Sequence, residues 1–445
     1  MLEIDSDRLE SWKEIAVFVG RTERTAMRWA EEGMPVGKVR GRVVASRAEI
    51  TRWLSSHPEQ ECTETETTPP SQVMESPREK VAWGWTAAVV AALVLAVVLV
   101  SLSRNLLRPK TPAKVSFTEN GFDVLDVSGN KLWAHAFPKR FDPTIVDFTM
   151  PLQGLARIDD FRSDGQREVL VVAPLRYGPN PDDSFEVDVE LFSNEGKLLW
   201  SYVPSEKFQF GDHELTGPWC IRDVFISPEG FKKTIWITAE HFTWGNSFVA
   251  QLDATTGRET VRFVNTGVIY KLNELKTARG SFLVAGGFNN EYDSGSLALI
   301  DETRPFAASP QTKGTRHECK SCADGLPDYY FVFPRSEINQ FEKVYEDAVH
   351  QIRINGNEME LAKFETRVIS SISTIYLLRT APAIGPLSMR YDSGYDMLHR
   401  EFSAEKKLNH SLENCPERLH PKSVRMWTPT AGWVDLPIKA AKASD

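Results

Sequence analysis

The sequence lacks the signatures of the common catalytic classes. It contains no catalytic-triad signature, no phosphate-binding loop and no H-E-x-x-H motif. It also lacks an overall positive charge, because 52 Lys and Arg stand against 61 Asp and Glu, for a net charge of −9. Composition therefore gives no global case for nucleic-acid binding. From the absence of these catalytic motifs we expect a protein that is not an enzyme.

Cysteine is scarce, with five in 445 residues. Cys319 and Cys322 form a C-x-x-C pair, but no second pair at metal-ligand spacing accompanies it, so a structural zinc site is weakly indicated. In an oxidising compartment a local disulfide between these two residues is expected. Pairing of one of them with Cys220 or Cys415 is an alternative.

Charge is missing altogether from residues 81–102, which are mainly apolar. A helix of that length spans roughly 33 Å, enough to cross the hydrocarbon core of a bilayer. Trp83 and Trp85 near its start suit the headgroup region. The segment begins too far into the chain for a cleaved secretory signal. The sequence therefore predicts one transmembrane helix at 81–102.

Residues 1–58 have the pattern of a small helical module. Ser11 with Glu14, and Ser46 with Glu49, are capping boxes that open two helices. A further helix is expected over residues 23–32 and a basic hairpin over 39–44. Residues 21–52 carry eight Lys and Arg against four Glu. This order of helices and hairpin is the plan of a winged helix-turn-helix.

The stretches SWKEIAVFVGRTERTAMRWAEEGMPV and RVVASRAEITRWL resemble the excisionase/MerR-like helix-turn-helix family of bacteria. The resemblance implies that the second helix enters the DNA major groove and that the hairpin contacts the DNA backbone. The DNA-binding residues that it implies are Arg21, Thr22, Arg24, Thr25, Arg28, Lys38, Arg40 and Arg42. The alternative is a module that keeps the fold but has lost DNA binding, or that binds a protein instead.

Residues 59–80 are acidic and rich in Thr, Ser and Pro, so they are expected to form a disordered linker.

The membrane topology has two conflicting signals in the sequence. Positive charge after residue 102 exceeds that before residue 81, which by itself favours a cytoplasmic C-terminal flank. A DNA-binding module has its target inside the cell, however. We therefore expect a bacterial inner-membrane protein with a cytoplasmic N-terminus and residues 114–445 periplasmic or extracellular.

Residues 114–445 consist of short apolar runs separated by Gly, Asp and Asn turns. Three stretches, which begin at residues 155, 219 and 268, share one order of strands and turns, as the blades of a β-propeller do. Residues 115–137 resemble only the second half of such a unit. We expect residues 425–438 to complete that blade and to close the ring. The predicted fold is a large all-β domain, a propeller of five to seven blades, with a pair of β-sandwiches as the runner-up.

Single repeats of this part resemble known propeller families. LDATTGRE resembles the quinoprotein-like (PQQ-type) repeat, and DFRSDGQRE resembles the FG-GAP/VCBS repeat. The second resemblance implies a calcium loop with Asp160, Asp164 and Glu168 as ligands. Arg162 stands where that pattern has a carboxylate or an amide, so an ion-paired cluster is favoured over a calcium site here. No other cofactor is expected.

The tryptophans of the C-terminal part are expected to pack within blades rather than to form a ligand platform. They include Trp200, Trp219, Trp236 and Trp244.

The whole pattern predicts a single-pass membrane-anchored, DNA-binding transcriptional regulator whose exported propeller senses or binds an unknown ligand or protein. A homodimer is expected, because two tethered DNA-binding units raise each other's effective concentration at a DNA site. The alternative is an exported propeller for cell-surface binding or envelope assembly, with a vestigial helix-turn-helix as its anchor.

Overall fold

The computed structural model describes residues 8–9, 11–19, 26–27, 29–30, 33–39, 42–56, 111–145, 152–178, 180, 184–227, 233–304, 306–322, 324–341, 345–366 and 372–441. The chain divides into two compact units, Met1–Leu99 and Val100–Asp445.

Among its described elements, the smaller unit has the helices α1 and α3 and a short antiparallel sheet. The elements are β1 (Arg8–Leu9), α1 (Trp12–Val19), β2 (Gly37–Val39), β3 (Arg42–Ser46) and α3 (Arg47–Ser56), and the strand order is β1–β3–β2. The hydroxyl oxygens of Ser11 and Ser46 accept hydrogen bonds from the backbone N–H groups of Glu14 (3.2 Å) and Glu49 (3.4 Å). Both helices therefore begin at the predicted caps.

The predicted winged helix-turn-helix is not supported as the fold of this unit. The second helix of that plan, expected at 23–32, is described only at residues 26–27 and 29–30. Its proposed DNA-reading residues Arg21, Thr22, Arg24, Thr25 and Arg28 lie outside the described residues, as does Arg40 of the hairpin. Lys38 and Arg42 lie in β2 and β3, but their side chains are not described.

The predicted membrane anchor at 81–102 also lies outside the described residues, as does the linker at 59–80. Within the ranges given above, no helix combines the length and the apolar character that crossing a membrane requires. The predicted single-pass inner-membrane location is therefore not supported.

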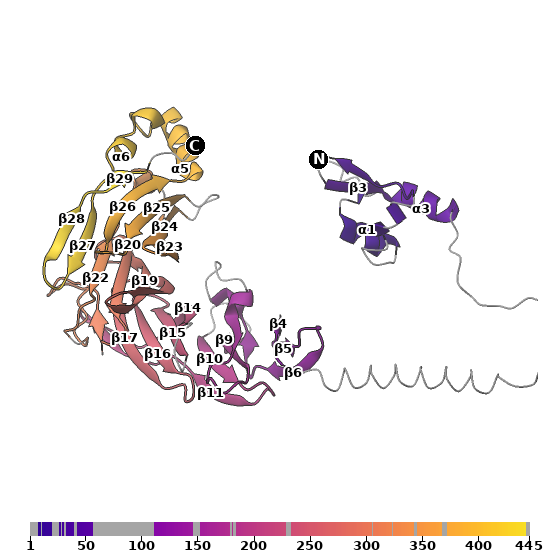
Figure 1. Ribbon diagram of the computed structural model, residues 1–445, viewed down its shortest axis with the longest axis horizontal. Coiled ribbons are helices and arrows are strands. Elements are labelled where there is room, and N and C mark those ends of the chain that lie inside the picture. The colour runs from indigo at the N-terminus through magenta and orange to yellow at the C-terminus, as the bar shows by residue number, and fades with distance from the viewer. Residues whose placement is uncertain are drawn as a thin grey trace, which may run out of the picture. The chain divides into compact units, whose positions relative to one another are not determined.

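The larger unit is a succession of mainly antiparallel sheets (Figure 1). The first sheet contains β4 (Lys114–Thr118), β5 (Gly121–Leu125) and β6 (Lys131–Ala136). The second has the order β11–β10–β9–β7, with β8 also paired to β9. Its strands are β7 (Arg140–Phe141), β8 (Ala156–Asp159), β9 (Glu168–Arg176), β10 (Phe185–Phe192) and β11 (Leu198–Tyr202). Two 3-10 turns, η1 (Pro143–Ile145) and η2 (Leu152–Leu155), precede β8.

The hairpin of β12 (Phe208–Phe210) and β13 (His213–Leu215) leads into the third sheet. That sheet has the order β14–β15–β16–β17–β21. Its strands are β14 (Trp219–Ile226), β15 (Thr234–His241), β16 (Ser247–Asp253), β17 (Glu259–Asn265) and β21 (Ala307–Ala308), the last paired in parallel with β17.

The fourth sheet has the order β18–β19–β20–β22–β27–β28. Its strands are β18 (Ile269–Thr277), β19 (Gly280–Asn289), β20 (Ser294–Asp301), β22 (Tyr329–Val332), β27 (Val424–Thr428) and β28 (Gly432–Leu436). The fifth, in the order β23–β24–β25–β26–β29, contains β23 (Tyr345–Asn355), β24 (Glu358–Thr366), β25 (Ser373–Arg379), β26 (Gly385–Tyr391) and β29 (Lys439–Ala440).

A helical cap, residues 392–420, lies in the chain between β26 and β27. It contains α5 (Ser393–Ala404), η4 (Leu412–Asn414) and α6 (Pro416–Leu419). Asp392 caps α5, because its carboxylate accepts a hydrogen bond from the backbone N–H of Tyr395 (2.9 Å). A further 3-10 turn, η3 (Asn339–Phe341), precedes β23. Cap and turn share a small core of Ile338, Ile372, Tyr395, Phe402, Leu408 and Leu412.

The third, fourth and fifth sheets pack through their first strands, because β14 contacts β18 and β18 contacts β23. The third sheet also contacts the second, through β14 and the inner strand β10. The three repeated stretches each supply consecutive strands of one sheet, as their pattern indicates. The prediction of a closed propeller, however, is wrong. Residues 425–438 do not complete the sheet of β4–β6, since β27 pairs with β22 and extends the fourth sheet. Among the described strands, no pairing joins the first sheet to the fifth, and the sheets are not closed into a ring.

Candidate functional sites

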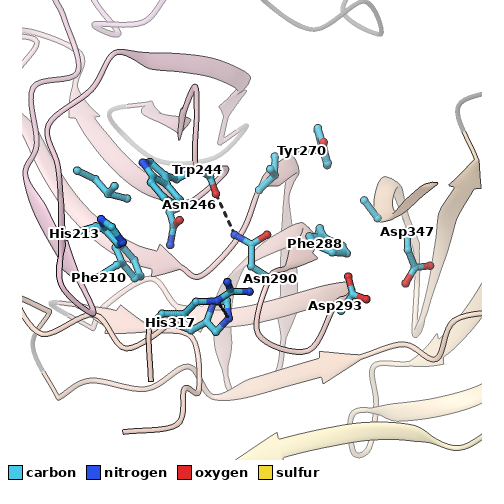
Figure 2. Close-up of a pocket in the computed structure, with 14 residues that line it drawn as sticks. Phe210, His213, Trp244, Asn246, Tyr270, Phe288, Asn290, Asp293, His317 and Asp347 are labelled. Carbon is cyan, nitrogen blue, oxygen red and sulfur yellow. Dashed lines mark hydrogen bonds between the residues drawn. The ribbon is translucent and has the colours of Figure 1, made fainter. Parts of the chain in front are cut away.

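A cavity of about 610 Å³ opens in the larger unit, where the β12–β13 hairpin meets the third and fourth sheets (Figure 2). Its lining combines aromatic rings with amides, a cation and carboxylates. The lining residues are Phe210, His213, Leu215, Trp244, Asn246, Val268, Tyr270, Phe288, Asn290, Asp293, Arg316, His317, Asp347 and Ala348. We refer to it below as the Trp244 cavity.

Trp244 lies in the turn between β15 and β16 with 51% of its surface exposed. Its ring stacks on His213 with ring centroids 4.8 Å apart and planes 29° apart. Its backbone is held at both ends: the N–H donates to His241 Nδ1 (3.3 Å), and the carbonyl accepts from Asn290 Nδ2 (3.2 Å) (Figure 2). The turn therefore fixes an open aromatic face at the cavity. Trp244 thus departs from the predicted packing role, which Trp200, Trp219 and Trp236 follow by being buried.

Arg316 and His317 form the cationic side of the cavity. The Nε–H of Arg316 donates to His317 Nε2 at 3.1 Å. Burial, and then the neighbouring charge of Arg316, lower the pKa of His317, so its imidazole is neutral at pH 7 and acts as an acceptor. Within the described part of the chain, no carboxylate lies at ion-pair distance from the Arg316 guanidinium. Its terminal nitrogens are therefore open to a ligand.

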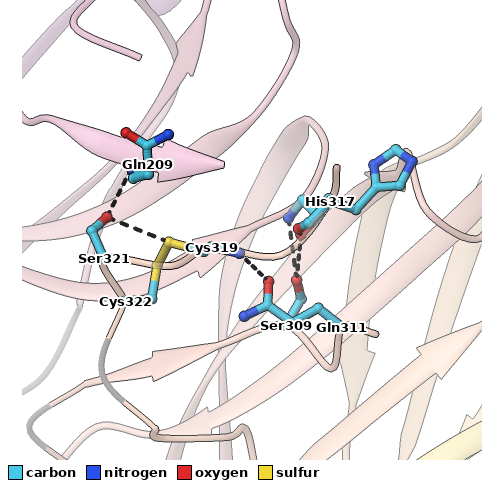
Figure 3. The surroundings of a disulfide bond; sticks show 8 residues. Gln209, Ser309, Gln311, His317, Cys319, Ser321 and Cys322 are labelled. Atoms are coloured by element: carbon cyan, nitrogen blue, oxygen red, sulfur yellow. Dashed lines mark hydrogen bonds between the residues drawn. A yellow bond between two sulfur atoms is a disulfide. The ribbon is translucent and has the colours of Figure 1, made fainter. Parts of the chain in front are cut away.

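The candidate cysteines Cys319 and Cys322 form a disulfide next to this side (Figure 3). The loop that they close is attached to β12: Lys320 N–H donates to Gln209 O (2.7 Å), and Gln209 N–H donates to Ser321 Oγ (2.8 Å). Phe210 and Cys319 add an isolated antiparallel bridge. The disulfide loop thus acts as an extra edge of the β12–β13 hairpin, which carries His213. Cys220 and Cys415, the alternative partners, are free and buried.

The acidic residues of the cavity are already paired. Asp293 forms an ion pair with Arg335. Asp347 accepts from Lys363 Nζ (2.5 Å), Ser294 Oγ (3.1 Å) and Gly295 N–H (3.0 Å), and Lys363 is fully buried. Burial raises the pKa of Asp347 to about 6 even beside Lys363. Arg316 is consequently the cation of the lining whose charge is not matched by a carboxylate.

A second constellation lies in and beside the helical cap. Glu337 precedes η3, His399 lies on α5, His410 follows α5, and Cys415 caps α6. One ligand atom from each lies within 4.8 Å of all the others. Both His Nε2 atoms lie near Glu337 Oε1, at 3.3 Å for His399 and 3.0 Å for His410, and Cys415 Sγ lies 3.1 Å from the same oxygen. We call this set the Glu337 cluster.

The Glu337 cluster was not predicted from the sequence. Cys415 was expected only as a possible disulfide partner, and no role was predicted for Glu337, His399 or His410. Glu337 is 73 residues from His410 and 78 from Cys415, and the two histidines are 11 residues apart. These separations match no common metal-binding motif, so only the folded chain shows that the side chains meet.

The predicted calcium ligands Asp160, Asp164 and Glu168 do lie together. Arg162 lies among them, with Nη2 at 2.9 Å from Asp164 Oδ2 and Nε at 2.9 Å from Glu168 Oε1. The other oxygen of Glu168 accepts from the backbone N–H of Phe161 (2.8 Å). Two of the three predicted ligands, Asp164 and Glu168, are thus ion-paired with Arg162, and calcium binding by this loop stays a prediction.

Comparisons with known proteins give no family. No protein-family model matches the chain, and no curated protein matches it. Similar solved structures include Synechocystis apocarotenoid oxygenase, at 12% identity over 62% of this chain and 72% of that chain, with a TM-score of 0.25. A chimera of this oxygenase with RPE65 matches at 9% over 63% and 69%, with a TM-score of 0.26. A eukaryotic initiation factor matches at 12% over 73% and 85%, with a TM-score of 0.22. Likenesses of this size carry no argument about activity.

These findings correct the sequence-based interpretation. The sequence resembles excisionase/MerR-like and propeller-repeat families in short stretches, but no family model matches the chain. Nothing supports the predicted membrane-anchored regulator, with its DNA and membrane partners and its homodimer. The alternative of an anchored surface protein is also left without support. The predictions of no enzyme and no cofactor are not upheld either, because the Glu337 cluster is a set of potential metal ligands.

Proposed function

We propose that the unit Val100–Asp445 binds a small organic anion that carries a ring, and that it does so in the Trp244 cavity. The observation that carries the proposal is the pairing, in one lining, of an open tryptophan face with a cation that has no carboxylate partner among the residues described. The volume of about 610 Å³ lies within the range of small-molecule sites, roughly 300–1,000 Å³.

Trp244 supports the ring part of the ligand. Its stack with His213 occupies one side of the indole, and half of the residue's surface is still exposed. A flat or apolar ring face that covers this surface gains apolar burial and stacking. Because the backbone of Trp244 is held by His241 and Asn290, little order has to be created on binding.

Arg316 supports the anionic part. A guanidinium binds a carboxylate through two parallel N–H groups, and its Nε–H is already used by His317. The two terminal nitrogens are left for the ligand. The amides of Asn246 and Asn290 lie in the same lining and supply both donors and acceptors for further polar groups.

The proposal is tested on the purified full chain by titration calorimetry with two carboxylate probes, glucuronate and 4-hydroxybenzoate, and their neutral counterparts, glucose and phenol. We expect the carboxylate of at least one pair to bind more tightly than its neutral counterpart. A charge-assisted hydrogen bond contributes about 1.5–3 kcal/mol, so Arg316→Gln should weaken that carboxylate about tenfold or more and spare the neutral probe. Trp244→Ala should weaken both members of the pair.

Two control variants match these changes. Phe242→Ala removes an exposed ring from the same turn that is not part of the cavity lining, and Arg353→Gln removes an exposed guanidinium on β23. Both should bind as the unchanged chain does. Absence of saturable binding of either carboxylate, or an equal effect of the controls and the cavity variants, would overturn the proposal.

A further inference from the structure

We propose that Glu337, His399, His410 and Cys415 bind one zinc ion, and that this ion fastens the helical cap to the β-sheet part of the unit. The inference is independent of the ligand proposed for the Trp244 cavity.

The spacing of the ligand atoms fits a tetrahedral zinc centre. With zinc–nitrogen and zinc–oxygen bonds of roughly 2.0–2.2 Å and a zinc–sulfur bond of about 2.3 Å, neighbouring ligand atoms lie about 3.3–3.8 Å apart. In the cluster the two histidine Nε2 atoms are 3.3 Å apart, and His399 Nε2 is 3.3 Å from Glu337 Oε1. The Glu337 oxygen is 3.0 Å from His410 Nε2 and 3.1 Å from Cys415 Sγ, so these four pairs of ligand atoms need shifts of only a few tenths of an ångström to hold an ion. The sulfur of Cys415 lies within 4.8 Å of both imidazole nitrogens.

The outer hydrogen bonds of both histidines direct lone pairs into the cluster. His410 Nδ1 lies 3.0 Å from Asn409 Oδ1, which is an acceptor, so Nδ1 carries the proton. Ser403 Oγ donates to backbone carbonyls, of His399 (2.8 Å) and His410 (2.9 Å), and is thus an acceptor for His399 Nδ1 at 3.3 Å. Partners of this kind orient the histidines of metal sites and fix their tautomers.

Four electron-pair donors therefore converge on one point: two imidazole nitrogens, a carboxylate oxygen and a sulfur. Without a cation, the lone pairs of two neutral imidazoles would point at each other and at a carboxylate. Among these four side chains, the thiol proton of Cys415 would then be the one hydrogen-bond donor directed into the cluster. Two nitrogens with one sulfur favour zinc over calcium or magnesium, which prefer oxygen ligands. Tyr395 Oη, 3.6 Å from Cys415 Sγ, adds a donor to the sulfur.

The burial and the number of the ligands indicate a structural site. The side chain of His399 is fully buried and Cys415 is buried, whereas Glu337 and His410 keep 16% exposure and leave a path for the ion. Four protein ligands complete a tetrahedron and leave no open position for a substrate. The core of the cap is small, and Glu337 lies outside the cap, before η3. A zinc ion would thus cross-link two segments whose apolar contacts are few.

The experiment measures metal in the purified full chain by elemental analysis, and then exchanges it for cobalt. We expect one equivalent of zinc per chain, and for the cobalt form the absorption of a tetrahedral centre with a thiolate-to-cobalt charge-transfer band. Cys415→Ser should abolish that band, and His410→Ala should lower the bound metal well below one equivalent. The control variants are Cys220→Ser, the other free buried cysteine that the structure describes, and His420→Ala, an exposed histidine of the same cap. Both should keep one equivalent and the band.

Two results would overturn the inference. One is a full chain that holds well below one equivalent of zinc after purification and after incubation with the ion. The other is a cobalt form without the thiolate band, or with a band that Cys220→Ser removes and Cys415→Ser leaves. The spectrum of the unchanged chain requires no variant to fold, so misfolding of Cys415→Ser cannot hide a negative result.

Discussion

The Nε2 atoms of His399 and His410 lie 3.3 Å apart because the chain reverses sharply at the end of α5. Lys406 adopts a positive φ of 59° just after the helix, a conformation in which the following N–H groups can bond back to the helix. The N–H groups of Lys407 and Leu408 both donate to Phe402 O, at 2.8 and 3.2 Å. Leu408 then packs into the small core of the cap, and His410 is brought back beside α5.

Removal of zinc should loosen the cap more than the sheets. If the ion links Glu337 to residues 399–415, a chelator should speed backbone hydrogen exchange at residues 392–420 by at least tenfold, because the remaining apolar core there is small. The second sheet, whose β9 is buried along its whole length, should be unaffected. Hydrogen exchange followed by mass spectrometry, with and without chelator, measures this. Re-addition of zinc should restore protection, and uniform acceleration across the unit would contradict the local role.

Lys363→Met should destabilise the unit strongly. Lys363 is fully buried between two carboxylates, with Nζ at 2.5 Å from Asp347 and 3.2 Å from Glu365. Although burial opposes it, the positive charge of Lys363 keeps the pKa of Glu365 below its usual value. Loss of one partner of a buried ion pair leaves an uncompensated charge and costs about 3–5 kcal/mol, which urea denaturation of the full chain would measure.

The triple variant Lys363→Met, Asp347→Asn, Glu365→Gln is the control for that prediction. It removes the buried charges together and should recover most of the lost free energy of unfolding, because neutral groups require less compensation. A triple variant as unstable as the single one would indicate that shape, rather than charge, decides the effect.

Two carboxylates on β10 should make the unit less stable as pH rises. Burial, and then the charge of Glu186, raise the pKa of Asp188 to about 6; burial, and then the charge of Asp188, raise that of Glu190 to about 7. Asp188 Oδ1 and Glu190 Oε2 are buried without a hydrogen-bond partner in the described structure. Their folded-state pKa values exceed the unfolded values of about 4, so their contribution is most favourable below pH 4 and is lost as pH rises to 7.

The variants Asp188→Asn and Glu190→Gln isolate this effect. At pH 7.5 each should raise the free energy of unfolding relative to the unchanged chain, by on the order of 2 kcal/mol, and at pH 4 the advantage should vanish. Glu195→Gln, an exposed position in the turn after β10, should show no such trend. Denaturant titrations from pH 4 to 8 test it; a difference that does not change with pH would exclude titration of these groups as the cause.

The strand units could be predicted from local sequence, but their assembly could not. The apolar run of β9 and the glycine turns mark strands, because side-chain alternation and turn chemistry act over a few residues. The partner of β27 is decided by contacts such as the pairing of Trp427 with Tyr330, almost 100 residues away. The repeated strand units suggested a closed ring of blades. A repeated sequence pattern, however, contains no information on which edge strands of the sheets remain unpaired.

The candidate sites show the same limit. Cys319 and Cys322 are three residues apart, so their pairing could be predicted, whereas the Glu337 cluster depends on a turn at Lys406 and on a loop far upstream. Trp236 and Trp244 looked alike as residue types. Their difference arises because Trp236 lies within β15 and Trp244 in a turn next to Gly245, which has a positive φ of 70°. That glycine was a usable signal of exposure.

Loss of the disulfide should weaken ligand binding more than it lowers stability. The bond closes a loop of few residues, so it restricts the unfolded chain little and contributes less than the 3 kcal/mol or so of a 15-residue loop. The same loop follows directly after Arg316 and His317, and its contacts with Gln209 align it with the β12–β13 hairpin. In the double variant Cys319→Ser, Cys322→Ser, the probe carboxylate should bind several-fold more weakly because Arg316 is less well positioned. Its neutral counterpart should bind nearly as before. Calorimetry with both probes measures binding, and a urea titration measures the free energy of unfolding. An equal loss of affinity for both probes, or a large drop in the free energy of unfolding, would show that the disulfide maintains the fold rather than the position of Arg316.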